Sequence, residues 1–122
     1  MHGLHLTADL RHCLAGQAAL VDTAALRRLC LAAVQSVGLH AVGELFHRFD
    51  APGGVTGVVL LAESHLAVHT WPELGAVTLD VYVCNLNEDN SACAETLLAA
   101  LERAFAAGHV ERHRVLRGSL QA

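Results

Sequence analysis

Hydrophobic and polar side chains alternate along several short stretches of the chain, and this pattern predicts β-strands. The alternation is regular over residues 4–10 and imperfect around Gly43 within residues 39–49, while residues 55–62 form a nearly continuous apolar run. Alternation places every second side chain on one face of a strand, whereas a continuous apolar run indicates burial on both faces. Further strands are predicted at residues 65–70, 75–84 and 109–116, with turns at residues 50–54 and 71–75.

Two longer segments carry the signals of helices. Leu26, Cys30 and Ala33 lie at helical spacing in the first, and the second, AETLLAALERAFAAG, consists of strong helix formers. The predicted helices run from a cap at Asp22 or Thr23 to about Ser36, with Gly38 beyond, and from a cap at Asn90 or Ser91 to Gly108. The order of strand, helix, several strands, helix and strand predicts an α+β two-layer sandwich, with both helices on one face of a largely antiparallel sheet. At 122 residues the chain is expected to form a single domain, residues 1–122.

The composition argues against several classes of protein. The chain has eight arginines, no lysine and twelve acidic residues, and it shows no basic stripe that would follow a phosphate backbone. Its apolar runs are far too short to span a bilayer. The four cysteines lack CxxC spacing, and the first residues do not resemble a secretory leader. We therefore expect a cytoplasmic protein with free thiols, no nucleic-acid partner and no membrane segment.

The segment ESHLAVHTWPE, residues 63–73, carries the candidate chemistry. Amine chemistry needs an electrophilic sink, which enzymes commonly obtain from pyridoxal phosphate held on a lysine. This chain has no lysine, so that route is closed. A serine offers another route, because its hydroxyl can attack the preceding carbonyl and the resulting ester can eliminate to leave a pyruvoyl group. A serine next to polar helpers is the minimum equipment for this route, and the segment contains it.

A longer block around this segment resembles a known family. The stretch GVTGVVLLAESHLAVHTWPELG, with FHRF upstream and Cys84 downstream, is similar to the prokaryotic S-adenosylmethionine decarboxylase proenzymes. The resemblance extends from the HLTADL strand to the second helix, and the ESHxxxHTWPE block is too long for a chance match. It implies a pyruvoyl-dependent decarboxylase of polyamine biosynthesis that acts on a small amino-acid substrate.

The resemblance also implies roles for individual residues. The chain is expected to cleave itself between Glu63 and Ser64, giving fragments 1–63 and 64–122, with the pyruvoyl group formed from Ser64. His69 matches the family histidine that assists processing, and Thr56 stands in place of a family serine near the processing centre. Cys84 matches the cysteine proposed as the acid that reprotonates the product. The family forms homodimers with sites near the subunit interface, so a homodimer is expected here.

Departures from the family pattern leave the substrate open. The family usually has an aromatic residue where this chain has Asp50, with Phe49 displaced by one position. Leu74 replaces a tyrosine, and Asn85 replaces the glycine that follows the cysteine. These changes remove ring surface and add polar groups, which would suit L-ornithine or L-arginine, whose distal cation can pair with Asp50. Alternatively, Phe49 still reaches the adenine of S-adenosylmethionine, the leading substrate, and Asp50 is a solvated turn residue. The substrate-binding candidates are Phe49, Asp50, Leu66 and Glu73.

Three further questions arise from the same segment. Ser64 and His69 are five residues apart and would face opposite sides of a regular strand, so either Ser64 lies in the turn before the strand or His69 reaches it across a neighbouring strand. His65 and His69 could form a metal pair, but no third ligand stands at a suitable spacing, so no metal is predicted. His5 has no predicted partner. An alternative to the enzyme is an unprocessed homologue that binds or regulates another protein.

Overall fold

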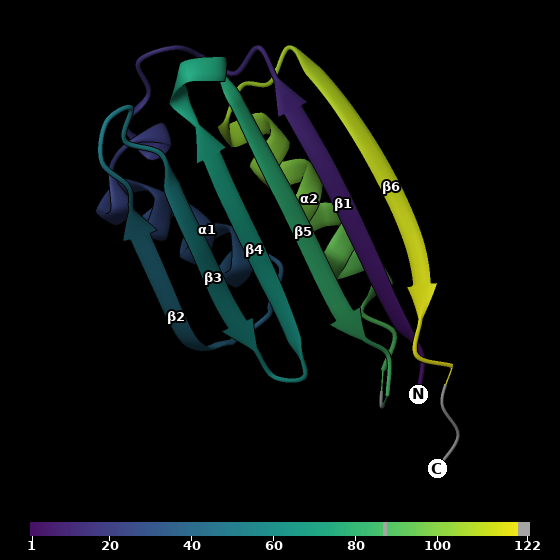
Figure 1. The fold of residues 1–122 in the computed structure, drawn as a ribbon. Coiled ribbons are helices and arrows are strands. Elements are labelled where there is room, and N and C mark those ends of the chain that lie inside the picture. Colours follow the sequence, from purple (N-terminus) through teal and green to yellow (C-terminus); the bar gives the residue numbers. More distant parts are fainter. Residues whose placement is uncertain (87, 120–122) are drawn as a thin grey trace.

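Six antiparallel strands form one sheet, and both helices cover the same face of it (Figure 1). The computed structural model describes residues 1–86 and 88–119. The strands are β1 (Gly3–Arg11), β2 (Ala41–Arg48), β3 (Val55–Leu61), β4 (Ser64–Trp71), β5 (Ala76–Cys84) and β6 (His109–Arg117). The helices are α1 (Thr23–Ser36) and α2 (Ser91–Ala104), with short 3₁₀ turns η1 (Ala18–Leu20) and η2 (Pro72–Leu74). This arrangement confirms the predicted α+β two-layer sandwich.

The strand order across the sheet is β2-β3-β4-β5-β1-β6. Strands β2 to β5 are neighbours in chain order, whereas β1 lies between β5 and β6 and pairs antiparallel with both. The register shift between Ala41 and Gly43 lies where the alternation of the sequence is imperfect. Because β1 enters the middle of the sheet, residues from the start of the chain face residues from its second half.

The core lies between the sheet and the helices. Alternate residues of the central strands point into it, and α2 contributes a continuous apolar face that ends at the buried Phe105. The buried residues of β1, β5 and α2 include Leu4, Leu6, Leu10, Val77, Val81, Val83, Leu97, Leu98 and Leu101. The remaining residues of each strand point to the opposite side, which we call the outer face of the sheet.

The helix ends follow local hydrogen bonding. Asp22 caps α1, because its Oδ1 accepts the backbone N–H of Ala24 at 2.9 Å. Of the two caps that the sequence predicted, Asp22 and Thr23, the structure therefore has Asp22. The second helix ends at Ala104, four residues before the predicted end at Gly108. Phe105 packs into the core and its carbonyl accepts hydrogen bonds from the 14–17 loop, while Ala106 takes a left-handed φ of 50°. These contacts stop the helix although its sequence favours continuation.

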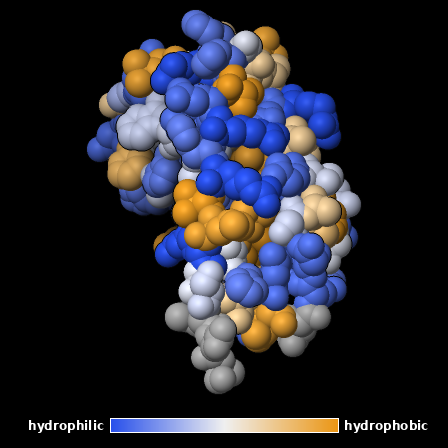
Figure 2. All heavy atoms as spheres, turned by 90° about the vertical axis from the view of Figure 1, so that its right-hand side faces the viewer, coloured by the Kyte–Doolittle hydropathy of each residue, from blue (hydrophilic) through white to orange (hydrophobic). Residues whose placement is uncertain are grey.

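Strand β6 forms one edge of the sheet and is exposed along its whole length. Arg112 and Arg114 point toward α2, where they form ion pairs with Glu95, and Arg112 also pairs with Glu102. Figure 2 views the molecule from this side and shows hydrophilic side chains interleaved with smaller hydrophobic areas. A charged edge strand of this kind disfavours pairing with further strands. Within the described residues, no helix has both the length and the apolar character to cross a membrane.

Candidate active site

The predicted cleavage site lies in the tight turn between β3 and β4, at the lower end of the sheet in Figure 1. Leu61 pairs with Ser64, so Ala62 and Glu63 alone form the turn. Glu63 has a φ of 59°, a left-handed conformation that costs a non-glycine residue about 1–2 kcal/mol. The peptide bond between Glu63 and Ser64 therefore follows a strained residue.

Ser64 is the first residue of β4 and is half-buried. Its Oγ accepts a hydrogen bond from the backbone N–H of Cys84, at 3.3 Å, across to the end of β5. Cys84 is also half-buried and is a free thiol. The structure thus brings together two of the three predicted catalytic residues, Ser64 and Cys84, at one end of the sheet.

His69 lies near the other end of β4. Thr56 is its cross-strand partner on β3, and Thr56 Oγ1 is 3.0 Å from His69 Nδ1. Five strand residues span about 16–17 Å, and the strand pleat puts Ser64 and His69 on opposite faces. Ser64 belongs to β4 and not to the turn, and the His69 side chain contacts Thr56 on the neighbouring strand β3 and not Ser64. Neither arrangement expected from the spacing brings these two residues together within one chain.

A cavity of about 200 Å³ adjoins His69 and Thr56. Three of the four predicted substrate-binding residues line it: Phe49, Asp50 and Glu73. The one-residue displacement of Phe49 therefore does not remove the ring from the cavity, and Asp50 lines the cavity as well. With Trp71 and Thr70, which also line it, the cavity has two aromatic side chains, two carboxylates, two threonines and an imidazole around a small space.

Two residues do not belong to this cavity. Leu66 is fully buried between the sheet and the helices, because even-numbered positions of β4 face the core. Leu66 does not line this cavity, so its predicted contact with substrate stays a prediction that this cavity does not support. Leu74 is highly exposed in η2 and lines a separate hollow with Trp71, so its replacement of the family tyrosine does not alter the lining around Phe49.

The asparagines after Cys84 serve the loop before α2. Asn90 Nδ2 donates to the Cys84 carbonyl at 3.0 Å, and Asn85 Oδ1 accepts the backbone N–H of Asn90 at 2.7 Å. The side chain of Asp89 accepts the N–H of Ser91, the first residue of α2. These contacts fix the end of β5, and with it the position of Cys84. The only sequence signal for this role was that Asn, Asp and Ser residues, which are common at helix starts, precede α2.

The other three cysteines have environments typical of structural residues. Burial raises the pKa of Cys30 to about 12, and burial also raises the pKa of Cys13. The Sγ of Cys93 donates a weak hydrogen bond to the Val37 carbonyl at 3.4 Å. A raised pKa keeps a thiol protonated and unreactive at neutral pH.

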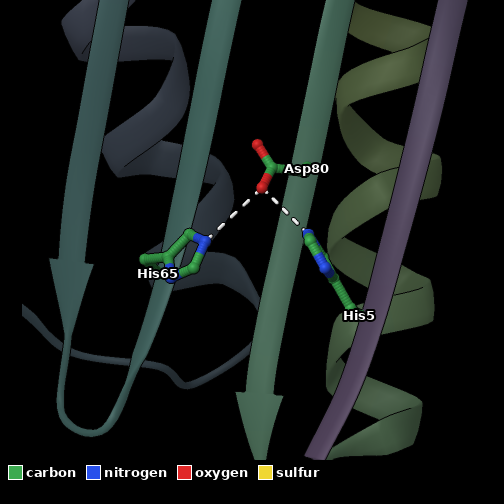
Figure 3. A group of neighbouring side chains, drawn as sticks. All are labelled: His5, His65 and Asp80. Carbon is green, nitrogen blue, oxygen red and sulfur yellow. Dashed lines mark hydrogen bonds and ion pairs between the residues drawn. The ribbon is translucent and has the colours of Figure 1, made fainter. Parts of the chain in front are cut away.

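A cluster of His5, His65 and Asp80 on the outer face was missed by the sequence analysis (Figure 3). Asp80 Oδ2 lies 2.9 Å from His5 Nε2 and 3.4 Å from His65 Nε2. His5 therefore has a partner, contrary to expectation, and His65 associates with His5 and Asp80 rather than with His69. The three residues come from β1, β4 and β5, so their spacing along the sequence carries no signal.

Comparisons with known proteins identify the family of the chain. Residues 4–118 match the sequence profile of the S-adenosylmethionine decarboxylase family. The chain is 39% identical over 116 residues to an S-adenosylmethionine decarboxylase proenzyme from Symbiobacterium thermophilum, covering 95% of this chain and 82% of the relative. It is 40% identical over 100 residues to a protein of the same name from Persephonella marina, covering 82% of this chain and 73% of the relative.

A solved structure shares the fold. The crystal structure of the adenosylmethionine decarboxylase from Aquifex aeolicus superposes with a TM-score of 0.82 at 32% sequence identity, covering 98% of this chain and 92% of that chain. The sequence match spans the turn at Glu63 and Ser64, the Thr56–His69 pair and the end of β5 at Cys84. The chain belongs to the S-adenosylmethionine decarboxylase family.

Proposed function

We propose that this protein is a self-processing, pyruvoyl-dependent decarboxylase that removes CO₂ from S-adenosylmethionine in polyamine biosynthesis. The observation that carries the proposal is the position of Ser64, directly after the left-handed Glu63 in a two-residue turn, in a chain of this family. The sequence has no lysine to hold pyridoxal phosphate, whereas a serine behind a strained peptide suits formation of a pyruvoyl group. That group supplies an electrophilic carbonyl that accepts the electron pair released with CO₂.

Processing begins with Ser64. Its Oγ attacks the Glu63 carbonyl, the bond from that carbonyl to the Ser64 nitrogen breaks, and an ester forms. Loss of the Ser64 α-proton and elimination of the Glu63 carboxylate then split the chain, and water replaces the nitrogen, which leaves as ammonia. The contact from the Cys84 N–H uses a lone pair of Oγ and leaves the hydroxyl proton free for removal. The left-handed Glu63 favours the reaction because cleavage releases its backbone strain.

His69 and Cys84 move protons in this proposal. His69 takes and returns protons during ester formation and elimination, and the Thr56 hydroxyl fixes the orientation of its ring through Nδ1. Cys84 delivers the proton that replaces CO₂ on the product carbon. Its half-buried thiol lies at the Ser64 end of the sheet, where the reacting carbon would be held.

A homodimer would supply the missing proximity between Ser64 and His69. A two-fold axis that sets the β4 strands of two copies in opposite directions brings the Ser64 end of one copy to the His69 end of the other. Exposed apolar side chains on the outer face offer area for such a contact, among them Leu45, Leu60 and Trp71. The cavity beside His69, at about 200 Å³, is also smaller than the roughly 300–1,000 Å³ of most small-molecule sites, so completion by a second copy is consistent with its size.

The lining of the cavity suits the proposed substrate. The Phe49 ring offers a face for stacking with adenine, and the sulfonium cation is attracted to aromatic faces and to carboxylates. Asp50 and Glu73 supply two carboxylates that can also accept hydrogen bonds from ribose hydroxyls. Ornithine and arginine would use the same carboxylates, and their distal cations are also attracted to aromatic faces, but they have no adenine to stack on the ring.

Intact mass measurement tests the proposal. The purified wild-type protein and the Ser64→Ala variant are incubated separately with S-adenosylmethionine, L-ornithine and L-arginine in the presence of a mild imine-trapping reductant. We expect the wild type to give two fragments split before residue 64, with the second carrying an adduct from S-adenosylmethionine alone, and Ser64→Ala to stay whole. An adduct only from ornithine or arginine would reassign the substrate. An uncleaved wild-type chain without adduct would contradict the enzyme and favour a binding or regulatory homologue.

A further inference from the structure

We propose that His5, His65 and Asp80 form a binding site for a divalent transition-metal ion such as Zn²⁺. The three side chains come from β1, β4 and β5, which are adjacent in the sheet, and all three lie on its outer face. Figure 3 shows both imidazole rings directed toward the carboxylate from either side. The Thr56–His69 pair is at the other end of β4, so this cluster is separate from that pair, whereas Ser64 and Cys84 lie at the same end of the sheet as the cluster.

The strand register explains why the three groups converge. His5 and His65 are both paired with Tyr82, one from each side of β5. Asp80 stands two residues before Tyr82 and therefore on the same face. The Tyr82 ring is stacked with the His65 ring at 5.8 Å and lies edge-on to the His5 ring at 6.0 Å. These ring contacts hold both imidazoles beside the carboxylate, so the ligands are positioned before an ion arrives.

The two separations from the carboxylate match those between ligands of one ion. Bonds of about 2.1 Å imply ligand separations of roughly 3.0 Å for octahedral and 3.4 Å for tetrahedral coordination. The observed separations from Asp80 Oδ2 are 2.9 Å to His5 Nε2 and 3.4 Å to His65 Nε2. All three ligand atoms lie within 4.8 Å of one another. An ion bound by all three needs the two imidazole nitrogens within about 4.2 Å of each other, twice the bond length.

The donor set selects the kind of ion. Two imidazoles and one carboxylate favour Zn²⁺, Co²⁺ or Ni²⁺ over Mg²⁺ and Ca²⁺, which prefer oxygen ligands. Three protein ligands leave at least one coordination position for water or another group. Within one chain, the side chains of His5, His65 and Asp80 are 21%, 35% and 29% exposed.

One neighbouring cation opposes the site. Arg117 lies over the Tyr82 ring, and its guanidinium is 3.4 Å from His5 Nδ1, the nitrogen that faces away from Asp80. Coordination through Nε2 places the imidazole proton on Nδ1, so this long contact is lost when an ion binds. Arg117 is at the exposed end of β6, and its flexible side chain can move into solvent.

The site has a consequence that rests on the proposed self-cleavage. His5 belongs to fragment 1–63, whereas His65 and Asp80 belong to fragment 64–122. A bound ion therefore links the two chains of the processed protein across β1, β5 and β4. It also fixes the residue next to the new chain end at position 64, so it would restrain the end that carries the reactive group.

Metal binding is tested on untagged, EDTA-treated Ser64→Ala protein, which does not depend on cleavage. We expect isothermal titration to show about one Zn²⁺ per chain, and Co²⁺ to give a visible absorption band from nitrogen and oxygen ligands. His5→Ala and Asp80→Asn should each weaken binding at least about tenfold. The matched control is His113→Ala, which removes an exposed histidine of the same face on β6 that faces Glu111 instead. It should bind as the parent does.

Two results would overturn the proposal. One is an absence of Zn²⁺ binding by the parent protein, which would leave the cluster as a set of hydrogen bonds between strands. The other is equal binding by the parent, His5→Ala and Asp80→Asn, which would place the ion elsewhere.

The link between fragments has its own measurement. The unfolding midpoint of the wild-type protein should fall when EDTA removes the ion and recover when Zn²⁺ is added, with no such change in His5→Ala. If the chain is whole but binds Zn²⁺ as expected, the proposed processing fails while the metal site stands. If the chain is cleaved and binds no ion, the metal site fails while the proposed function stands.

Discussion

If two chains share the processing site, a chain that lacks His69 should be cleaved when it is paired with a chain that supplies it. The perturbation is to produce two defective variants, Ser64→Ala and His69→Ala, first separately and then together. Ser64→Ala cannot form the ester and His69→Ala lacks the imidazole, so each alone is expected to remain whole. In a mixed dimer, the His69→Ala chain still carries Ser64 and its partner still carries His69.

The structure sets the size of the expected effect. Ser64 and His69 are separated by about 16–17 Å along β4, which is more than five times the roughly 3 Å reach of a hydrogen bond. No side-chain rotation spans this gap, so cleavage within one chain should be negligible. With equal production and random pairing in a two-fold dimer, about half of the His69→Ala chains have a Ser64→Ala partner. About half of all His69→Ala chains should therefore be cleaved, whereas no Ser64→Ala chain should be cleaved.

The assay is denaturing gel electrophoresis followed by intact mass measurement of the co-produced protein. A small mass label on one variant, such as ¹⁵N, identifies which chain was cut when the variants are purified separately, mixed and allowed to exchange subunits. The reasoning is refuted if wild-type protein is cleaved while the mixture is not, or if His69→Ala alone is cleaved as fast as wild type. A cleavage rate of wild type that does not change on dilution to a monomer would contradict it independently.

Three other predictions follow from single residues. Thr70 is buried, and its Oγ1 accepts the backbone N–H of Val55 at 2.8 Å and donates to the Leu20 carbonyl at 2.7 Å. Thr70→Val should lower the free energy of unfolding by about 2–4 kcal/mol in urea denaturation, because two buried backbone groups lose their partner. Thr70→Ser should recover most of this loss. Burial raises the pKa of Cys30 to about 12, so its thiol stays protonated below that pH; in native protein at pH 8, iodoacetamide should modify Cys84 while leaving Cys30 unmodified until denaturant is added, as peptide mass mapping would show. Asp50→Ala should raise the KM for S-adenosylmethionine several-fold if the carboxylate in the cavity contacts the sulfonium. Asp50→Asn should raise the KM less, because its amide oxygen keeps part of the contact. Unchanged turnover of S-adenosylmethionine, ornithine and arginine in both variants would remove Asp50 from the substrate site.

Much of the local structure could be read directly from the sequence. The alternation over residues 4–10 and the apolar run at 55–62 identified strands because side-chain direction in a strand repeats every two residues. Asp22 marked the start of α1 because its carboxylate can accept a free N–H of the first turn, as it does here. The end of α2 was predicted too late, since the helix propensity of its last residues gave no sign of the buried Phe105 and its contacts with the 14–17 loop.

The candidate site, too, could be predicted only in part from the sequence. The block around Ser64 and His69 is contiguous in sequence, so the family and the predicted cleavage bond could be inferred from it. The cavity beside His69 requires the 49–50 turn, β3 and η2 to converge, which depends on the pairing of β2 with β3 and of β3 with β4. The spacing of five residues also indicated that Ser64 and His69 would face opposite sides of a strand. Only the bounds of β4 showed that the two residues are not close together within one chain.

The sequence by itself determined most of the elements and the family, because each depends on residues that are close together in the chain. Only the tertiary structure decided which distant side chains meet. Asp80 contacts His5, 75 residues away, because β1 enters the sheet beside β5 in a specific register. A shift of that register by one residue would turn His5 into the core and a leucine outward. Strand order and register arise from packing of the whole sheet against its helices, and no local pattern in the sequence encodes them.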